Sequence, residues 1–261
     1  MARPGRSGLW RWAAVLAVFV VLPGSICRAG DGAPQIEVVT EDLPPYNFVE
    51  NGVVTGSSTE VVRAVFREVG MEAKITVLPW ARAMNETLTK PNVLIYTIAT
   101  TPERQNLFKW VGEINSGKVV VYCLKARPIT LRSLEDAKKY RVGVIFQDFR
   151  QDYLLRHGFV EGENLESANS HALNYAKLKA GRIDLWPMDV SVMNYYVRHA
   201  GDDPDAILIP VLEMPSLDAE THFSMAFSRQ TPDELVDRFR RGLKKIKDDG
   251  TYDAILQKWR N

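Results

Sequence analysis

The sequence predicts an α/β protein of two lobes, each a mixed, mostly parallel sheet flanked by helices. Apolar runs of β type alternate with amphipathic helical segments along nearly the whole chain. The alternation forms two successive series, and two lobes of similar size suit the roughly 230 residues that remain after an apolar N-terminal segment. A late strand and two terminal helices follow the second series, and we expect them to return to the first lobe.

The N-terminal segment, residues 1–29, has the composition of an export signal. Three arginines without an acid precede an apolar core, Ala13 to Leu22, and Ala29 offers a small residue for cleavage. The core is short for a bilayer span, so a membrane anchor is the less favoured alternative. Cleavage near Ala29 discards Cys27, although Cys27 itself is a candidate for lipidation. The cleaved protein keeps Cys123, which lies in an apolar run and is predicted to be a buried thiol. We therefore expect a periplasmic protein.

The first series opens with an apolar strand and a helix that has a clear buried face. Ser and Thr caps start the segment 57–70, and Gly70 fits its end. Thr101 and Pro102 suit the cap and first position of a further helix. Strands are predicted at residues 35–40, 74–80, 92–98 and 118–125, and helices at 57–70, 81–90 and from 101.

The second series has the same alternation and is followed by the late strand. Strands are predicted at 141–146, 182–188, 206–212 and 222–228, and helices at 133–140, 149–158, 170–181, 191–201, 231–250 and 251–260. The first lobe then comprises 34–119 and 222–261, and the second 120–221. Crossing segments near 118–124 and 218–227 form a hinge, with a ligand cleft at the carboxyl ends of the strands.

Several stretches resemble the family 3 extracellular solute-binding proteins, in the order seen in that family. They are "PPYNF", "TTPERQNLFKWVG", "YRVGVIF", "AGRIDLW" and "KKIKDDGTYDAILQKW", and the resemblance covers Pro34 to Trp259. It implies a type 2 periplasmic-binding-protein fold whose lobes close on an amino acid or a related small carboxylate. It also implies delivery to the membrane permease of an ABC transporter. We expect a monomer that needs no cofactor.

The resemblance places the α-carboxylate of the ligand on Arg104 of the "TPER" segment. Tyr96, Thr97 and Ala99, just before it, are implied to supply hydroxyl or backbone contacts, and Asp189 to receive the α-ammonium. A guanidinium suits this role because it grips a carboxylate through two parallel hydrogen bonds. The residues alone leave alternatives open, since Arg104 also suits a surface ion pair and Asp189 also suits a helix N-cap.

Other expected cleft residues are aromatic or depart from the family pattern. Tyr46 and Trp80 suit aromatic walls of the cleft, with core packing as the alternative, and Arg82 reaches either the cleft or solvent. The segment "FQDFRQ", Phe146 to Gln151, stands where family members usually carry Gly-Thr, and it contains Gln147 and Arg150. We expect them to compensate for that pair, or else this side binds a different group. A variant ligand is therefore expected: a modified or aromatic amino acid, or another carboxylate.

The composition argues against several other function classes. The formal net charge is +1, so no field attracts nucleic acid. The histidines do not share a helical face at metal-ligand spacing. An enzyme on the same fold, similar to cyclohexadienyl dehydratases, is the alternative function, and Glu41 and Asp42 are its candidate acids or bases. A ligand-sensing subunit for a signalling partner is a further alternative.

Overall fold

The computed structural model describes residues 35–214 and 222–259, which belong to one compact unit. The predicted export signal and part of the second predicted crossing segment lie outside the described residues. Strands and helices alternate in the described chain, and the expected α/β fold class is confirmed. Within the described ranges, no helix combines the length and apolar character that a membrane crossing needs.

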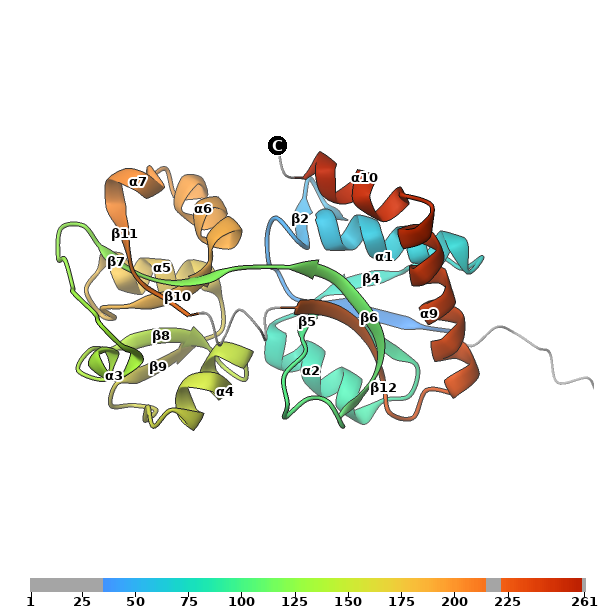
Figure 1. Ribbon diagram of the computed structural model, residues 1–261, viewed down its shortest axis with the longest axis horizontal. Coiled ribbons are helices and arrows are strands. Elements are labelled where there is room, and N and C mark those ends of the chain that lie inside the picture. The colour runs from blue at the N-terminus through green and yellow to red at the C-terminus, as the bar shows by residue number, and fades with distance from the viewer. Residues whose placement is uncertain (1–34, 215–221, 260–261) are drawn as a thin grey trace, which may run out of the picture. The chain divides into compact units, whose positions relative to one another are not determined.

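A five-stranded sheet, in the order β4-β1-β5-β12-β6, forms the part of the structure that we call the first lobe (Figure 1). Strand β1 pairs in parallel with β4 and β5, whereas β12 lies antiparallel between β5 and β6. The late strand therefore does insert beside strands from the start of the chain. The bounds are β1 Glu37–Thr40, β4 Ile75–Val77, β5 Val93–Ala99, β6 Phe108–Ser116 and β12 His222–Ser228.

Helices cover both faces of this sheet. Helices α1 (Ser57–Glu68) and α9 (Asp233–Asp248) pack on one face with Leu94 of β5, and α2 (Trp80–Thr89) packs on the other with Ile95. Strand β5 is buried along its whole length because both faces are covered. Helix α10 (Thr251–Lys258) packs against α1 and α9, and a β-hairpin of β2 (Phe48–Glu50) and β3 (Val53–Thr55) precedes α1.

A β-bulge at Thr97 interrupts the alternation of β5. Tyr96 pairs with Met225 and Ile98 with Ser224, so Thr97 is an extra residue on β5. Its φ of 60° is left-handed, which costs free energy for a β-branched residue. Bulges re-aim side chains near sites, and this one places Thr97 beside the cavity described below.

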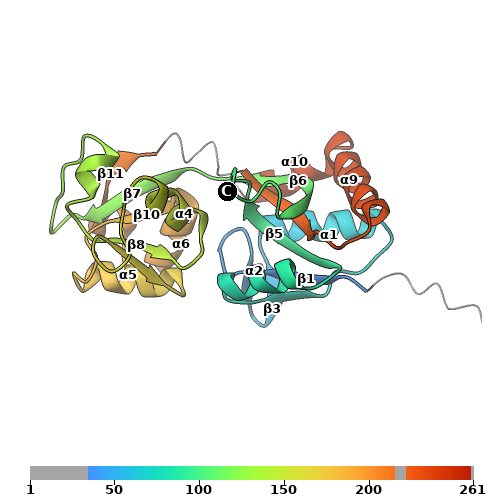
Figure 2. The same ribbon diagram turned by 90° about the horizontal axis from the view of Figure 1, so that it is seen from below.

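A three-stranded antiparallel sheet, β10-β7-β11, and a parallel pair, β8 with β9, form the part that we call the second lobe. Figures 1 and 2 show β7 arriving directly from β6 of the other lobe. The expectation of mostly parallel sheets is thus wrong in detail, because β7 lies antiparallel to both of its neighbours and two of the four pairings in the five-stranded sheet are also antiparallel. The bounds are β7 Val119–Leu124, β8 Val142–Ile145, β9 Leu165–Ala168, β10 Trp186–Asp189 and β11 Leu208–Glu213.

Five described helices belong to this lobe. They are α3 Leu134–Ala137, α4 Phe149–Arg156, α5 His171–Lys179, α6 Val190–His199 and α7 Pro204–Ile207. Serine or aspartate caps begin each of them, with side-chain acceptors from Ser133, Asp148, Ser170, Asp189 and Asp203.

The helix predicted from Thr101 does not form. The amides of Arg104 and Gln105 both donate to the carbonyl of Thr101, which makes a single turn, and β6 begins at Phe108. Thr101 does start a turn, but the residues from Phe108 onward form the extended edge strand β6, which pairs with β12. Arg104 therefore lies in a turn and not in the first turn of a helix.

Candidate functional site

Residues from both lobes surround a small central cavity. Its lining includes Glu41, Trp80, Thr97, Ala99, Arg104 and Arg150, and its volume is about 10 Å³, roughly the space of one water molecule. A side cavity of about 260 Å³ shares Glu41 and Trp80 with it, and an outer cavity of about 410 Å³ shares Arg104. The three cavities are therefore neighbours that share lining residues.

Arg104 is the buried cation of the first lobe and is only 2% exposed. Its Nη2 donates to the carbonyl oxygen of Gln147, at 3.0 Å, and to the carboxylate of Asp152, at 3.2 Å. The guanidinium carbon lies 5.2 Å from the ring centroid of Trp80, a cation–π contact. Burial lowers the pKa of Arg104, and the charge of Asp152 opposes that shift. The other terminal nitrogen, Nη1, has no hydrogen-bond partner among the described residues.

Gln147 takes part through its backbone. Its φ is 61°, and its carbonyl oxygen accepts hydrogen bonds from both Arg104 and the indole of Trp80, the latter at 2.6 Å. Its amide donates to the side chain of Gln151 at 2.6 Å. The left-handed turn at Gln147 thus presents one carbonyl from the second lobe to two side chains of the first.

Asp148 and Arg150 form a buried ion pair at the start of α4. One carboxylate oxygen of Asp148 accepts the amide of Arg150 at 2.7 Å, and the other accepts its Nη2 at 2.5 Å. The guanidinium lies 4.6 Å from the Phe149 ring centroid. Nη1 of Arg150 lacks a partner in the described part of the chain. Asp148 at this helix start repels an anionic ligand group, but the charge of Asp148 is balanced by Arg150.

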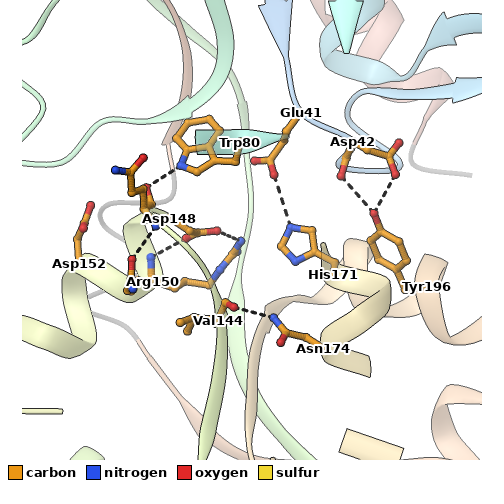
Figure 3. A network of polar contacts seen from close by, with 12 residues as sticks. Glu41, Asp42, Trp80, Val144, Asp148, Arg150, Asp152, His171, Asn174 and Tyr196 are labelled. Atoms are coloured by element: carbon orange, nitrogen blue, oxygen red, sulfur yellow. Dashed lines mark hydrogen bonds and ion pairs between the residues drawn. The ribbon is translucent and has the colours of Figure 1, made fainter. Parts of the chain in front are cut away.

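Glu41 and His171 face each other from different lobes (Figure 3). Oε2 of Glu41 lies 3.7 Å from Nε2 of His171. Burial, reinforced by the charge of Asp148, raises the pKa of Glu41 to about 8. Burial, reinforced by the charge of Arg150, lowers the pKa of His171 to about 3. Both side chains are therefore predominantly uncharged at pH 7.

A second contact between the lobes lies beside this pair. The Tyr196 hydroxyl donates to the backbone carbonyl of Asp42 at 3.1 Å and to its carboxylate at 3.2 Å. The ring of Tyr196 also lies against His171, with centroids 5.7 Å apart. Figure 3 shows the two pairs side by side, with Glu41 and Asp42 coming from one loop.

Four of the predicted residues line none of these three cavities, namely Tyr46, Arg82, Tyr96 and Asp189. The Tyr96 hydroxyl points to the α1 face of the sheet and shares a hydrogen bond of 2.9 Å with Thr59. The Arg82 side chain is 65% exposed and pairs with Glu86. Ala99, by contrast, lines the central cavity as expected.

Tyr46 and Asp189 contact each other at a distance from Arg104. The Tyr46 hydroxyl donates to Oδ1 of Asp189 at 3.1 Å. The same carboxylate accepts the amides of Lys118, Ser191 and Val192 at 2.9, 2.9 and 3.1 Å. Asp189 thus caps α6 and binds the segment that crosses between the lobes. No described contact joins it to Arg104.

His171, Tyr196 and Asp152 were not among the expected cleft residues. His171 follows the carboxyl end of β9 and opens α5, so the rule that ligands bind at strand ends would have selected it. Strand β9 itself was not predicted, and that omission removed the signal. Tyr196 and Asp152 lie inside helices, where a sequence gives no sign of a cleft.

Comparison with known proteins identifies the family. Residues 36–261 match the model of the bacterial extracellular solute-binding proteins, family 3. This chain belongs to that family. The match confirms the family that the sequence motifs indicated.

The solute-binding protein is similar to two proteins of Bacillus subtilis. It is 22% identical over 219 residues to the arginine-binding extracellular protein ArtP of Bacillus subtilis, covering 84% of this chain and 82% of ArtP. It is 21% identical to the probable amino-acid-binding protein YxeM of Bacillus subtilis, covering 97% and 95%.

Two solved structures share the fold. A histidine kinase sensor domain with similarity to periplasmic binding proteins matches with a TM-score of 0.75 at 22% identity, covering 87% of this chain and 96% of that one. An ancestral arginine-binding protein bound to arginine matches with a TM-score of 0.73 at 22% identity, covering 86% and 97%.

Proposed function

We propose that this solute-binding protein captures an amino acid, or a related small carboxylate, between its lobes and delivers it unchanged to an ABC transporter permease. One observation carries the proposal. Nη1 of Arg104, Nη1 of Arg150 and the hydroxyl of Thr97 are buried, line the central cavity, and lack hydrogen-bond partners among the described residues. Each such group costs about 1–3 kcal/mol.

A carboxylate matches these unused groups. Its two oxygens offer about four acceptor sites, and bonds from a guanidinium to a carboxylate are among the strong ones. Asp152, whose side chain is 35% exposed, shares Arg104 in this structure. A ligand carboxylate can replace that half-exposed partner while Asp148 continues to neutralise Arg150.

Entry of a ligand requires the lobes to separate. The central cavity holds about one water, far less than an amino acid. We assign the first lobe to 34–119 and 222–261 and the second to 120–221, so the pairs Arg104–Asp152 and Glu41–His171 form on closure. The pairing of β12 with β5 and β6 supports this assignment. Hinge closure around a ligand is the expected motion.

The named relatives support an amino-acid ligand. They include an arginine-binding, a probable histidine-binding and an L-cystine-binding protein, and ancestral structures were solved with arginine and with glutamine. Asp189 remains the predicted acceptor of the α-ammonium, a role in which the ammonium displaces the hydroxyl of Tyr46. We further propose that residues 1–29 direct export to the periplasm and that the protein acts as a monomer.

A calorimetric screen of the purified protein against the standard amino acids and short organic acids tests the proposal. The expected result is saturable binding of at least one carboxylate, with the compound recovered unchanged. Binding of no carboxylate contradicts the proposal. Conversion of the compound in the cleft instead establishes an enzyme, for which Glu41 in its acid form is the first residue to substitute.

A further inference from the structure

The side cavity offers room next to the central one. Its volume is about 260 Å³, and it is lined by Glu41, Asp42, Trp80, His171 and Tyr196 among others. Glu41 and Trp80 line both cavities. A ligand whose carboxylate lies on Arg104 and Arg150 can therefore extend past Glu41 into the side cavity.

His171 brings unused hydrogen-bonding groups to this cavity. It is 2% exposed, and neither ring nitrogen has a partner in the described chain. A neutral imidazole carries one donor and one acceptor, and leaving both unmet when buried costs free energy. The 3.7 Å between Glu41 and His171 exceeds a hydrogen bond, so the two side chains do not satisfy each other.

The charges around the pair are balanced. Arg150 and Asp148 face it from α4, Arg104 faces it from the turn before β6, and Asp42 lies beside it with its carboxylate on Tyr196. A ligand cation placed here is repelled by Arg150, and an anion is repelled by Asp148 and Asp42. An uncharged polar group meets no such repulsion, and Glu41 retains its proton because burial raises its pKa to about 8.

We propose that Glu41 and His171 form a second subsite of the ligand cleft, which hydrogen-bonds an uncharged polar group, such as a carboxamide, at the end of the ligand remote from its carboxylate. This inference rests on the proposed function. Glu41 in its acid form supplies an O–H donor, and His171 supplies one N–H donor and one acceptor. A carboxamide, with its carbonyl oxygen and its NH₂ group, complements that set.

The subsite makes capture proton-linked. When the lobes separate, Glu41 meets water and regains an ordinary pKa near 4.5. At pH 7 it is then ionised, so closure around an uncharged group takes up one proton from solution. If the ligand places a guanidinium there instead, Glu41 stays ionised and closure takes up no proton. Proton uptake therefore reports the charge of the group that the pair receives.

Calorimetry at pH 7 in two buffers of different ionisation enthalpy tests this, with L-glutamine, L-asparagine, L-glutamate and L-arginine as probes. We expect the two carboxamides to bind more tightly than L-arginine and L-glutamate, with close to one proton taken up. Glu41→Gln should abolish the uptake, and His171→Ala should weaken carboxamide binding at least tenfold. The exposed His199→Gln should change neither quantity.

The outcomes separate this inference from the proposed function. If L-arginine or L-glutamate binds more tightly than the carboxamides, or if His171→Ala binds as the wild type does, the subsite is refuted and carboxylate capture stands. Carboxamide binding without proton uptake also refutes it. If a carboxylate outside the panel binds while the carboxamides do not, the subsite is refuted and the proposed function stands. If no carboxylate binds at all, the proposed function falls and the subsite with it.

Discussion

The hydroxyl of Tyr46 donates to the carboxylate of Asp189 across 3.1 Å, which joins the loop after β1 to the N-terminus of α6. Three backbone amides share that carboxylate. One of them belongs to Lys118, in the segment that passes from β6 to β7. Asp189 therefore fixes the crossing segment, a helix start and an aromatic side chain of the other lobe at one point.

Loss of the Tyr46 hydroxyl should loosen this junction. Tyr46→Phe removes one donor to a carboxylate that keeps three others, so we expect a loss of about 1 kcal/mol in the free energy of unfolding. Urea denaturation measures it. Tyr140→Phe, at a partly buried tyrosine of the second lobe, is the matched control and should leave the midpoint in place.

The loss of unfolding free energy at Asp189 should depend on which residue replaces it. Asp189→Ala removes the cap of α6 and leaves the Lys118 amide without an acceptor, so we expect a loss of about 2 kcal/mol. Asp189→Asn keeps a capping oxygen and should lose less. A variant with alanine that unfolds at the wild-type urea concentration would contradict the capping role. Selective loss of amine-bearing ligands in the asparagine variant would support the predicted ammonium contact.

The Asp148–Arg150 pair should be costly to break from one side. Arg150→Met leaves a buried carboxylate without its cation, and we expect a loss of about 3–5 kcal/mol. The double variant Asp148→Asn/Arg150→Met keeps a capping side chain without the charge and should recover much of that loss. A double-mutant cycle in urea measures the coupling, and additive losses would show that the pair is not coupled.

Glu41 should make stability fall as pH rises. Its folded-state pKa of about 8 lies above the ordinary 4.5, so its contribution is fully present below pH 4.5 and is lost as pH rises through 8. The unfolding free energy of the wild type, relative to Glu41→Gln, should fall by on the order of 5 kcal/mol across that window. Glu37→Gln, at an exposed position of β1, is the matched control.

Arg104→Ala should weaken the binding of any carboxylate ligand at least tenfold, which corresponds to about 1.4 kcal/mol. The variant removes a buried guanidinium that the cavity presents to the ligand, and Arg132→Ala at an exposed position is the control. Calorimetric titration provides the dissociation constants. Unaltered affinity in a variant whose circular dichroism is native would remove Arg104 from the site.

Periodicity and caps predicted most of the fold because each depends on a few adjacent residues. The strand 222–228 and the helix that follows the cap Ser170 begin where their sequences indicate. Helix α1 also begins at Ser57, but its N-cap is Gly56 and the predicted Ser or Thr side-chain cap does not form. The segment from Thr101 shows where prediction from adjacent residues fails. It carries good helix-start residues, but the pairing of Phe108–Ser116 with β12, more than 100 residues away in the chain, determines its conformation.

The candidate site was predictable where motif residues act directly. Arg104, Thr97 and Arg150 meet at one cavity. The side chain of Tyr96 could not be placed, because the face of β5 that it occupies depends on packing against α1 and a bulge changes the alternation at the next residue. Glu41 and His171 lie 130 residues apart in sequence, and only the arrangement of the lobes brings them together.

A crystal structure of the protein with its tightest-binding carboxylate tests the central claim most directly. The account predicts a ligand carboxylate oxygen within about 3 Å of Nη1 of Arg104, with Arg150 or Thr97 donating to the same group. A ligand whose carboxylate lies elsewhere, with Nη1 of Arg104 still lacking an acceptor, would contradict it.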